Sequence, residues 1–160
     1  PIMDFSGKVM NESLDIISWA MESPVPNVHT YTEAEEIASQ ELIQLFDSKF
    51  KHHLDRYKYS SRYGVDPLEH QEECKAILEN LDAEIHPNPW IFGKQVSLLD
   101  ISILPFIRQC KIANPDWFFA QNFTKVIPLL NYFEKSDLFI QAMQKFELWD
   151  PIKKNGNIFP

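Results

Sequence analysis

The feature that most constrains the fold is residues 96–107, where a helix-start signal precedes an almost wholly apolar run. Ser97 and Asp100 have the spacing of a capping box, with aspartate in place of the usual glutamate. The residues that follow are apolar on nearly every side of a helix: Leu98, Leu99, Ile101, Ile103, Leu104, Phe106 and Ile107. A helix of this kind is buried. We therefore expect it to be the central helix of a mainly all-α body, with a bend at Pro105, because proline removes a hydrogen bond from the helix.

Helical patterns cover most of the chain on both sides of this segment. Thr32 and Glu35 form a capping box that predicts a helix of roughly six or seven turns. The breaks expected after it are Ser60, Ser61 and Gly64. Asp66 is the expected cap of a second long helix, which has Pro67 at its first position. Shorter helices are expected over residues 115–120, 123–135 and 137–146.

The beginning of the chain has a different pattern. Residues 1–10 predict a β-hairpin with Gly7 in the turn, and residues 10–21 predict a helix. Pro24 and Pro26 end that helix and favour an extended linker. A two-stranded hairpin is only marginally stable alone. We therefore expect this part to be the edge of a larger α/β unit.

Composition excludes several classes of function. The 160 residues suit one domain, and a net charge of -8 argues against a nucleic-acid partner. Four glycines argue against a glycine-rich nucleotide loop, and no apolar run approaches the ~20 residues of a membrane span. The two cysteines, Cys74 and Cys110, are too few for a disulfide framework and favour a reducing compartment. Both cysteines follow apolar patterns, so we expect their thiols to be buried and inert. We also expect a cytoplasmic protein without a membrane segment.

A candidate binding site lies at the junction of the hairpin and the first helix. Ser13 lies at the expected start of the helix. There its hydroxyl and the free N–H groups of the first helical turn suit the binding of a small carboxylate. Glu12 beside it suits an ammonium group, so together they suit an amino-acid head group. The alternative is that Ser13 or Asn11 only caps the helix.

The order of these motifs resembles the glutathione transferase superfamily. The stretch from Pro1-Ile2-Met3 to Glu12-Ser13 is similar to the second half of its thioredoxin-like N-terminal domain. Trp90-Ile91-Phe92-Gly93 with the Ser97 and Asp100 capping box is similar to its all-helical C-terminal domain. The resemblance implies that Glu12 and Ser13 hold the γ-glutamyl end of glutathione and that Pro1 is a cis proline. It also implies that the capping box serves folding.

The resemblance also implies how the chain is divided. Residues 1–22 correspond to the second half of the glutathione-binding domain, residues 23–31 to a linker and residues 32–160 to the helical C-terminal domain. The thiol-activating tyrosine, serine or cysteine of the family would precede Pro1. We therefore expect the chain to be a piece of a larger parent, and to lack glutathione transferase activity by itself.

A second candidate site lies near the end of the first long helix. In the family this helix lines the pocket of the electrophilic co-substrate, which makes His53 and Tyr57 candidates, together with Arg108 at the end of the apolar helix. Alternatively, the two helix residues pack against a neighbouring helix, and Arg108 forms a structural ion pair, for which Asp100 or Asp116 is the expected partner. A metal site at His52 and His53 is rejected, because adjacent helix residues point in different directions and no third ligand is evident.

The resemblance implies a function for the parent protein. That function is attack of the glutathione thiolate on a small electrophile, with glutathione as co-substrate, no other cofactor and a homodimeric assembly. One alternative is a non-catalytic helical protein-interaction module, as in translation factors and aminoacyl-tRNA synthetases. The other is a glutaredoxin-like thiol reductase. The electrophile and the subclass do not follow from the sequence.

Overall fold

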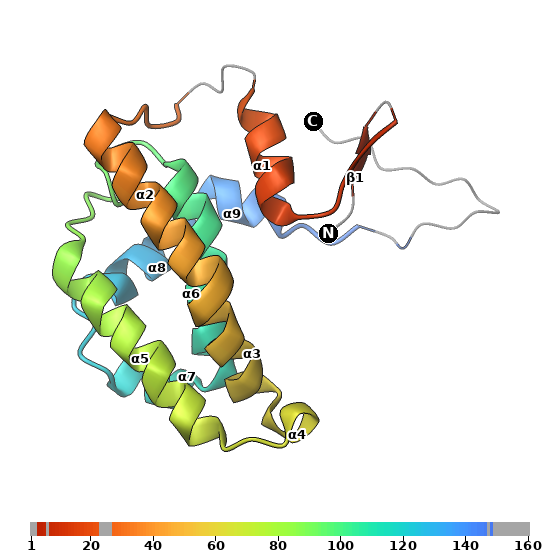
Figure 1. Ribbon diagram of the computed structural model, residues 1–160. Coiled ribbons are helices and arrows are strands. Elements are labelled where there is room, and N and C mark those ends of the chain that lie inside the picture. The colour runs from red at the N-terminus through yellow and green to blue at the C-terminus, as the bar shows by residue number, and fades with distance from the viewer. Residues whose placement is uncertain (1–2, 6, 23–26, 147, 149–160) are drawn as a thin grey trace.

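The computed structural model describes residues 3–5, 7–22, 27–146 and 148 (Figure 1). The chain is mainly helical, as predicted. The strands in the described residues are β1 (Met3–Phe5) and β2 (Lys8–Met10). Its helical elements are, in chain order, α1 (Ser13–Met21), α2 (Glu33–Leu45), the π-helical segment η1 (Phe46–Phe50), α3 (Lys51–Lys58), α4 (Ser60–Tyr63), α5 (Pro67–Glu84), α6 (Leu98–Ala113), α7 (Pro115–Ala120), α8 (Val126–Lys135) and α9 (Asp137–Ala142).

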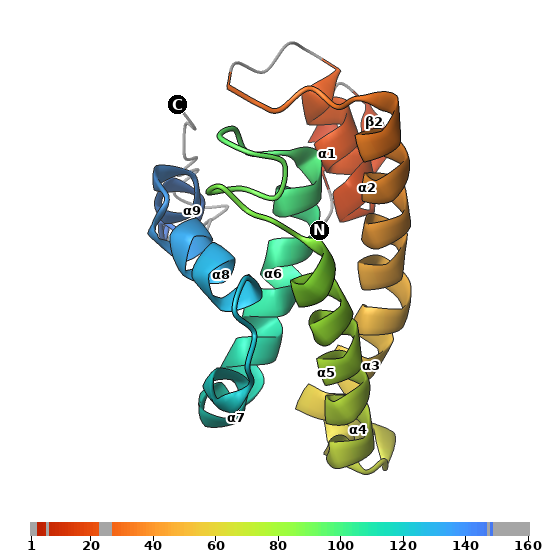
Figure 2. The ribbon, with the colours of Figure 1, turned by 90° about the vertical axis from the view of Figure 1, so that its left-hand side faces the viewer.

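Helix α6 is the central element of the bundle. Helices α2 and α3 pack along one side of it, and α7 and α8 pack against it elsewhere (Figure 2). Its completely buried side chains include the aliphatic residues Leu99, Ile103, Leu104 and Ile107. The prediction of a buried central helix is therefore confirmed. The helix continues through Pro105, which is itself exposed.

The predicted capping box at the start of α6 is present and completely buried. Ser97 Oγ accepts a hydrogen bond from the Asp100 N–H, and the Asp100 carboxylate accepts hydrogen bonds from the Ser97 N–H and hydroxyl. The second Asp100 oxygen accepts the N–H of Ile91 at 3.1 Å. Burial raises the pKa of Asp100, against the lowering effect of these hydrogen bonds. This carboxylate therefore joins the start of α6 to the loop before it.

The first long helix begins as predicted but is not regular. Thr32 and Glu35 form the expected capping box. The helical rod then runs from α2 through η1 into α3, and the π-helical segment was not predicted. In η1 the rings of Phe46 and Phe50 are completely buried, with centroids 4.6 Å apart. A π-helical turn inserts an extra residue, so it changes which side of α3 faces the rest of the bundle.

The expected breaks after this helix are partly wrong. The chain leaves the helical conformation at Tyr59 (φ -123°, ψ 38°), and Ser60 and Ser61 lie inside the short helix α4. Gly64 ends α4 with a φ of 65°, the left-handed conformation that favours glycine at a helix C-terminus.

The start of α8 also differs from the prediction. Helix α8 begins at Val126 rather than near residue 123, and α9 ends at Ala142. Asp82 on α5 accepts hydrogen bonds from the N–H groups of Thr124, Lys125 and Val126. These bonds cap α8 from another helix, and such a cap leaves no local sequence signal.

The predicted hairpin and helix at the beginning of the chain are confirmed where they are described. Strands β1 and β2 pair antiparallel, with Met3 opposite Met10, and Gly7 in the turn has a φ of 82°. Helix α1 follows, and none of its nine described residues is fully buried. Pro1, the expected cis proline, and residues 23–26 of the expected linker lie outside the described residues.

The second half of the expected linker lies against the body. The N–H of His29 donates a hydrogen bond to the carbonyl oxygen of Val96 at 2.8 Å. The Tyr31 hydroxyl accepts the N–H of Leu99, in the first turn of α6, at 2.8 Å. The rings of His29 and Phe92 are stacked with centroids 5.6 Å apart. These contacts join the segment after α1 to the start of the central helix.

Candidate functional site

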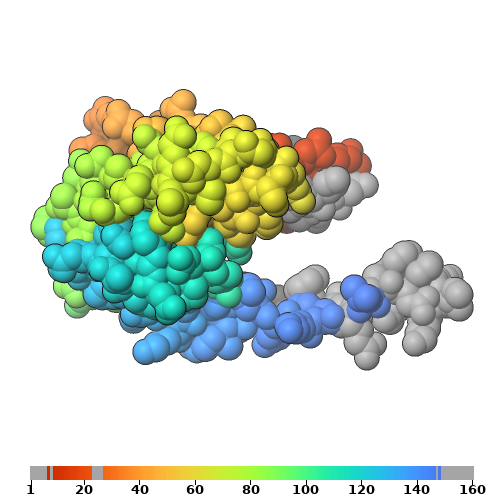
Figure 3. All heavy atoms as spheres, turned by 90° about the horizontal axis from the view of Figure 1, so that it is seen from below, coloured from red at the N-terminus to blue at the C-terminus, as the bar shows by residue number. Residues whose placement is uncertain are grey.

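A cavity of about 560 Å³, here called the α6 cavity, is lined by residues of α1, η1, α6, α8 and α9 and by Met143. Its walls are mainly apolar and include Leu14 and Ile17 from α1, Phe106 from α6 and Phe139 from α9. Seen from below, the surface is hollowed between the side formed by α3 and α4 and the side formed by α9 (Figure 3). A mainly apolar cavity of this size, with a few polar groups, is typical of a small-molecule site.

Ser13 lies at the edge of the α6 cavity and is exposed. It is the first residue of α1, and the N-cap residue is Glu12, also exposed. No side chain among the described residues makes a capping hydrogen bond at this helix start. The alternative that Ser13 or Asn11 serves only as a cap is therefore not what the structure shows. Among the described residues, no side chain caps the first N–H groups of α1 beside the cavity.

Arg108 also lines the α6 cavity and forms an ion pair. Its Nε donates to a carboxylate oxygen of Glu134 on α8 at 3.1 Å, and its guanidinium carbon lies 5.1 Å from the centre of the Phe139 ring. The expected partners Asp100 and Asp116 were wrong. Asp100 is held in the buried capping box, and the side of α6 that carries Arg108 faces α8.

The other two predicted co-substrate residues are not among the described residues that line the α6 cavity. His53 and Tyr57 lie instead between α3 and α5. His53 Nδ1 is 2.8 Å from His70 Nδ1, and the Tyr57 hydroxyl accepts a hydrogen bond from Gln71 at 2.5 Å. Burial lowers the pKa of His53 and raises the pKa of Tyr57. The structure thus matches the alternative in which both side chains pack against a neighbouring helix.

His52 and Arg56, also on α3, are not among the described residues that line the α6 cavity either. Arg56 lies within 3.0 Å of His52 Nδ1 and over the ring of Tyr63, 4.7 Å from its centre. Within the described part of the chain, no group of three or more His, Cys, Asp or Glu residues is arranged to hold a metal ion.

Both cysteines are buried and free. A hydrogen bond with Cys74 and burial raise the pKa of the Cys110 thiol. A thiol in this state is a weak nucleophile. Neither cysteine is among the described residues that line the α6 cavity.

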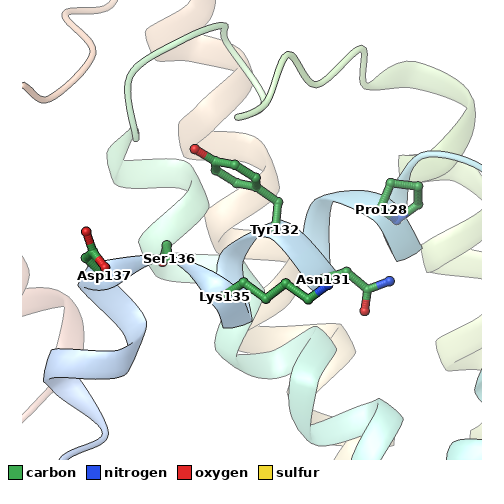
Figure 4. A pocket seen from close by; sticks show the side chains of 6 residues that line it. All are labelled: Pro128, Asn131, Tyr132, Lys135, Ser136 and Asp137. Carbon is green, nitrogen blue, oxygen red and sulfur yellow. The ribbon is translucent and has the colours of Figure 1, made fainter.

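Two other hollows of the described surface are less suited to be a binding site. One, of about 600 Å³, lies between α1, α9 and the loop before α6 and includes Lys94. The other, of about 490 Å³, lies on α8 and the start of α9, and its side chains spread over open surface (Figure 4). The first has no carboxylate among its described lining residues. The second has Lys135 and Asp137, but none of its described lining residues is buried.

Sequence reasoning missed several residues of the α6 cavity. Asp47 comes from the unpredicted η1 segment, and Phe139 comes from the short helix α9. Ser102 and Gln109 are polar residues in a largely apolar helix. They are seven residues apart and therefore lie on the same side of the helix. This spacing of polar residues could have predicted that one side of α6 is polar.

No helix in the described ranges has both the length and the apolar character needed to cross a bilayer.

Comparison with known proteins identifies the family. The family model for the glutathione S-transferase C-terminal domain matches residues 40–135, more than half of the chain. Glutathione S-transferase L1 of Arabidopsis thaliana is 26% identical over 113 residues, covering 70% of this chain and 45% of that protein. Glutathione S-transferase L3 of the same plant is 29% identical over 110 residues, covering 68% and 44%.

The chain thus spans less than half the length of the curated relatives that it matches. No solved structure matches it significantly. The helical bundle around the capped central helix and the match over residues 40–135 agree, and the chain belongs to the glutathione S-transferase family.

Proposed function

We propose that this chain binds the γ-glutamyl end of glutathione at the start of α1 and forms, in the α6 cavity, the cleft for an electrophilic co-substrate. The observation that carries the proposal is the position of Ser13. It belongs both to the start of α1, where no side chain of the described residues caps the helix, and to the lining of the α6 cavity. A tripeptide held at Ser13 would therefore lie beside an apolar cavity.

The start of α1 has the chemistry for an amino-acid head group. The free N–H groups of a helix N-terminus and the Ser13 hydroxyl suit a carboxylate. The carboxylate of Glu12, exposed next to them, suits an ammonium group. The γ-glutamyl end of glutathione carries both groups on one carbon.

In the proposed reaction, the sulfur of the glutathione thiolate forms a bond to an electrophilic atom of the co-substrate. The leaving group departs with the electron pair of the broken bond, and the thiol proton passes to solvent. The α6 cavity contributes by holding the co-substrate close to the sulfur and by excluding water. No residue of this chain is proposed to activate the thiol.

The proposal is tested by calorimetric titration with glutathione. We expect Ser13→Ala to raise the Kd for glutathione about tenfold, because a hydrogen bond to a charged group is lost. Ser61→Ala, at an exposed position on α4, is the matched control and should leave the Kd unchanged. Equal affinities for the two variants would contradict the proposal.

A further inference from the structure

Neighbouring side chains orient the guanidinium of Arg108, but only some of its N–H groups are hydrogen-bonded within the described residues. Its Nε is bonded to Glu134 and its plane lies near the ring of Phe139. Within the described residues, its two terminal amino groups have no hydrogen-bond partner. The side chain is 25% exposed and lines the α6 cavity. The pair of N–H groups that matches an oxyanion is therefore available beside the cavity.

The charges around Arg108 leave an excess of positive charge. Lys111 Nζ contacts the same Glu134 carboxylate at 2.5 Å, so two cations share one anion. The side chains of Lys111 and Glu134 are 16% and 20% exposed. Weak solvation strengthens the attraction of this cluster for a second anion. Asp47, the carboxylate that also lines the cavity, lies 4.0 Å from Lys51.

A buried hydroxyl provides a second, independent indication of a ligand. Ser102 lines the α6 cavity and is only 7% exposed. Its Oγ has no hydrogen-bond partner in the described part of the chain. A buried polar group without a partner is unfavourable, because it has lost its hydrogen bonds to water. A polar group on a bound molecule would satisfy it. By contrast, Gln109 is already bonded to Lys58.

We propose that the co-substrate of the α6 cavity is an apolar, ring-containing molecule with an oxyanion group, a carboxylate or sulfonate, which Arg108 binds. The aromatic walls at Phe106 and Phe139 suit the ring system. The terminal amino groups of Arg108 receive the oxyanion, and Ser102 bonds to a polar group of the same molecule. This inference rests on the proposed function, because it names the class of molecule that enters the proposed cleft.

The test compares two fluorescent probes with similar apolar bodies. One is 8-anilinonaphthalene-1-sulfonate, and the other is the uncharged N-phenyl-1-naphthylamine. Arg108→Gln should raise the Kd of the sulfonate about tenfold or more and leave that of the neutral probe unchanged. Arg108→Lys should have an intermediate effect, because it keeps the charge but loses the planar pair of donors. Arg62→Gln, at an exposed position on α4, is the matched control and should change neither Kd.

A second variant separates anion binding from a purely structural ion pair. Glu134→Gln removes the carboxylate that neutralises Arg108, so it should lower the Kd of the sulfonate. If Arg108→Gln does not fold, as judged by circular dichroism, this second variant decides. The inference is overturned if Arg108→Gln changes both probes equally or changes neither. It is also overturned if Glu134→Gln leaves sulfonate binding unchanged or weakens it.

The same variants distinguish a failure of this inference from a failure of the proposed function. Ser13→Ala should lose glutathione affinity while keeping the preference for the sulfonate probe. Suppose that the protein prefers the sulfonate through Arg108 but binds glutathione equally well without the Ser13 hydroxyl. That result would contradict the proposed glutathione site and support the inference that the cavity binds an apolar oxyanion. The reverse result would contradict only the inference about Arg108.

Discussion

At the scale of single residues, the sequence predicted one pocket for Arg108, His53 and Tyr57, and placed the last two on a common helix face. In the structure Arg108 lines the α6 cavity, and His53 and Tyr57 do not. The sequence could not show which neighbour that face meets. The π-helical segment η1 inserts a residue before α3 and changes its rotation relative to α2. In the structure, Asp47 of this segment lines the α6 cavity, whereas His53 of α3 faces His70 on α5.

The pairing of His53 with His70 predicts a loss of stability in weak acid. Burial lowers the pKa of His53 from 6.5, so the folded state favours the neutral ring. Nearby Lys49, His52 and His70 act in the same direction, and Glu73 acts against them. The unfolded chain therefore binds the proton first as the pH falls below about 6.5, and the free energy of unfolding decreases.

Urea unfolding at pH 7.5 and pH 5.5 measures this effect. Wild-type protein should lose more stability between the two values than His53→Gln does. His86→Gln, at an exposed position after α5, is the control and should behave like the wild type. An equal loss in wild type and His53→Gln would show that this pair does not titrate in the expected way.

At the scale of helices, sequence reasoning succeeded where the signal is local. The capping boxes at Ser97 and Thr32 and the Asp66 cap each lie within a few residues of the helix that they start, and all three are present. The start of α8 was missed because its cap, Asp82, comes from α5. A cap that depends on the packing of two helices cannot be seen in a local pattern.

Removal of the Asp100 carboxylate should destabilise the protein strongly. Asp100→Ala leaves the buried N–H groups of Ser97 and Ile91 without a partner, so we expect a loss of about 2–4 kcal/mol in the free energy of unfolding. Asp116→Ala, at an exposed position on α7, should have a much smaller effect. Similar losses in the two variants would refute the structural role of the capping box.

Asp82 should stabilise the protein in a pH-dependent way. Burial raises its pKa, but the hydrogen bonds from Val126, Lys125 and Thr124 outweigh this effect, and the pKa lies below 3.8. The stabilisation is therefore fully present above about pH 3.8 and is lost as the pH falls through the folded-state pKa. Asp82→Ala should lower the free energy of unfolding at pH 7 by about 1–3 kcal/mol.

Chemical unfolding of Asp82→Ala beside Glu84→Ala, an exposed position on α5, tests this expectation. The difference between Asp82→Ala and the wild type should shrink as the pH is lowered toward 3. A difference that is independent of pH would contradict the assignment of the effect to the carboxylate.

At the scale of the whole molecule, the fold class and the family were predictable, but the cavity was not. The buried central helix and the helix-start motifs follow from local patterns of apolar and capping residues. The α6 cavity is formed by segments that are far apart in the sequence, from Ser13 on α1 to Phe139 on α9. Its shape depends on how these segments pack, and no periodicity within one segment contains that information.

In the proposed function, the start of α1 and the α6 cavity form one continuous binding site. The most direct measurement is an NMR titration of isotopically labelled protein with S-hexylglutathione, which joins the tripeptide to an apolar chain. We expect the amide signals of Ser13 and Leu14 and those of the cavity walls on α6 and α9 to shift together, with a single Kd for a continuous site. This expectation is contradicted if the signals near Ser13 do not shift, or if the shifts are centred on His53 and Tyr57 between α3 and α5.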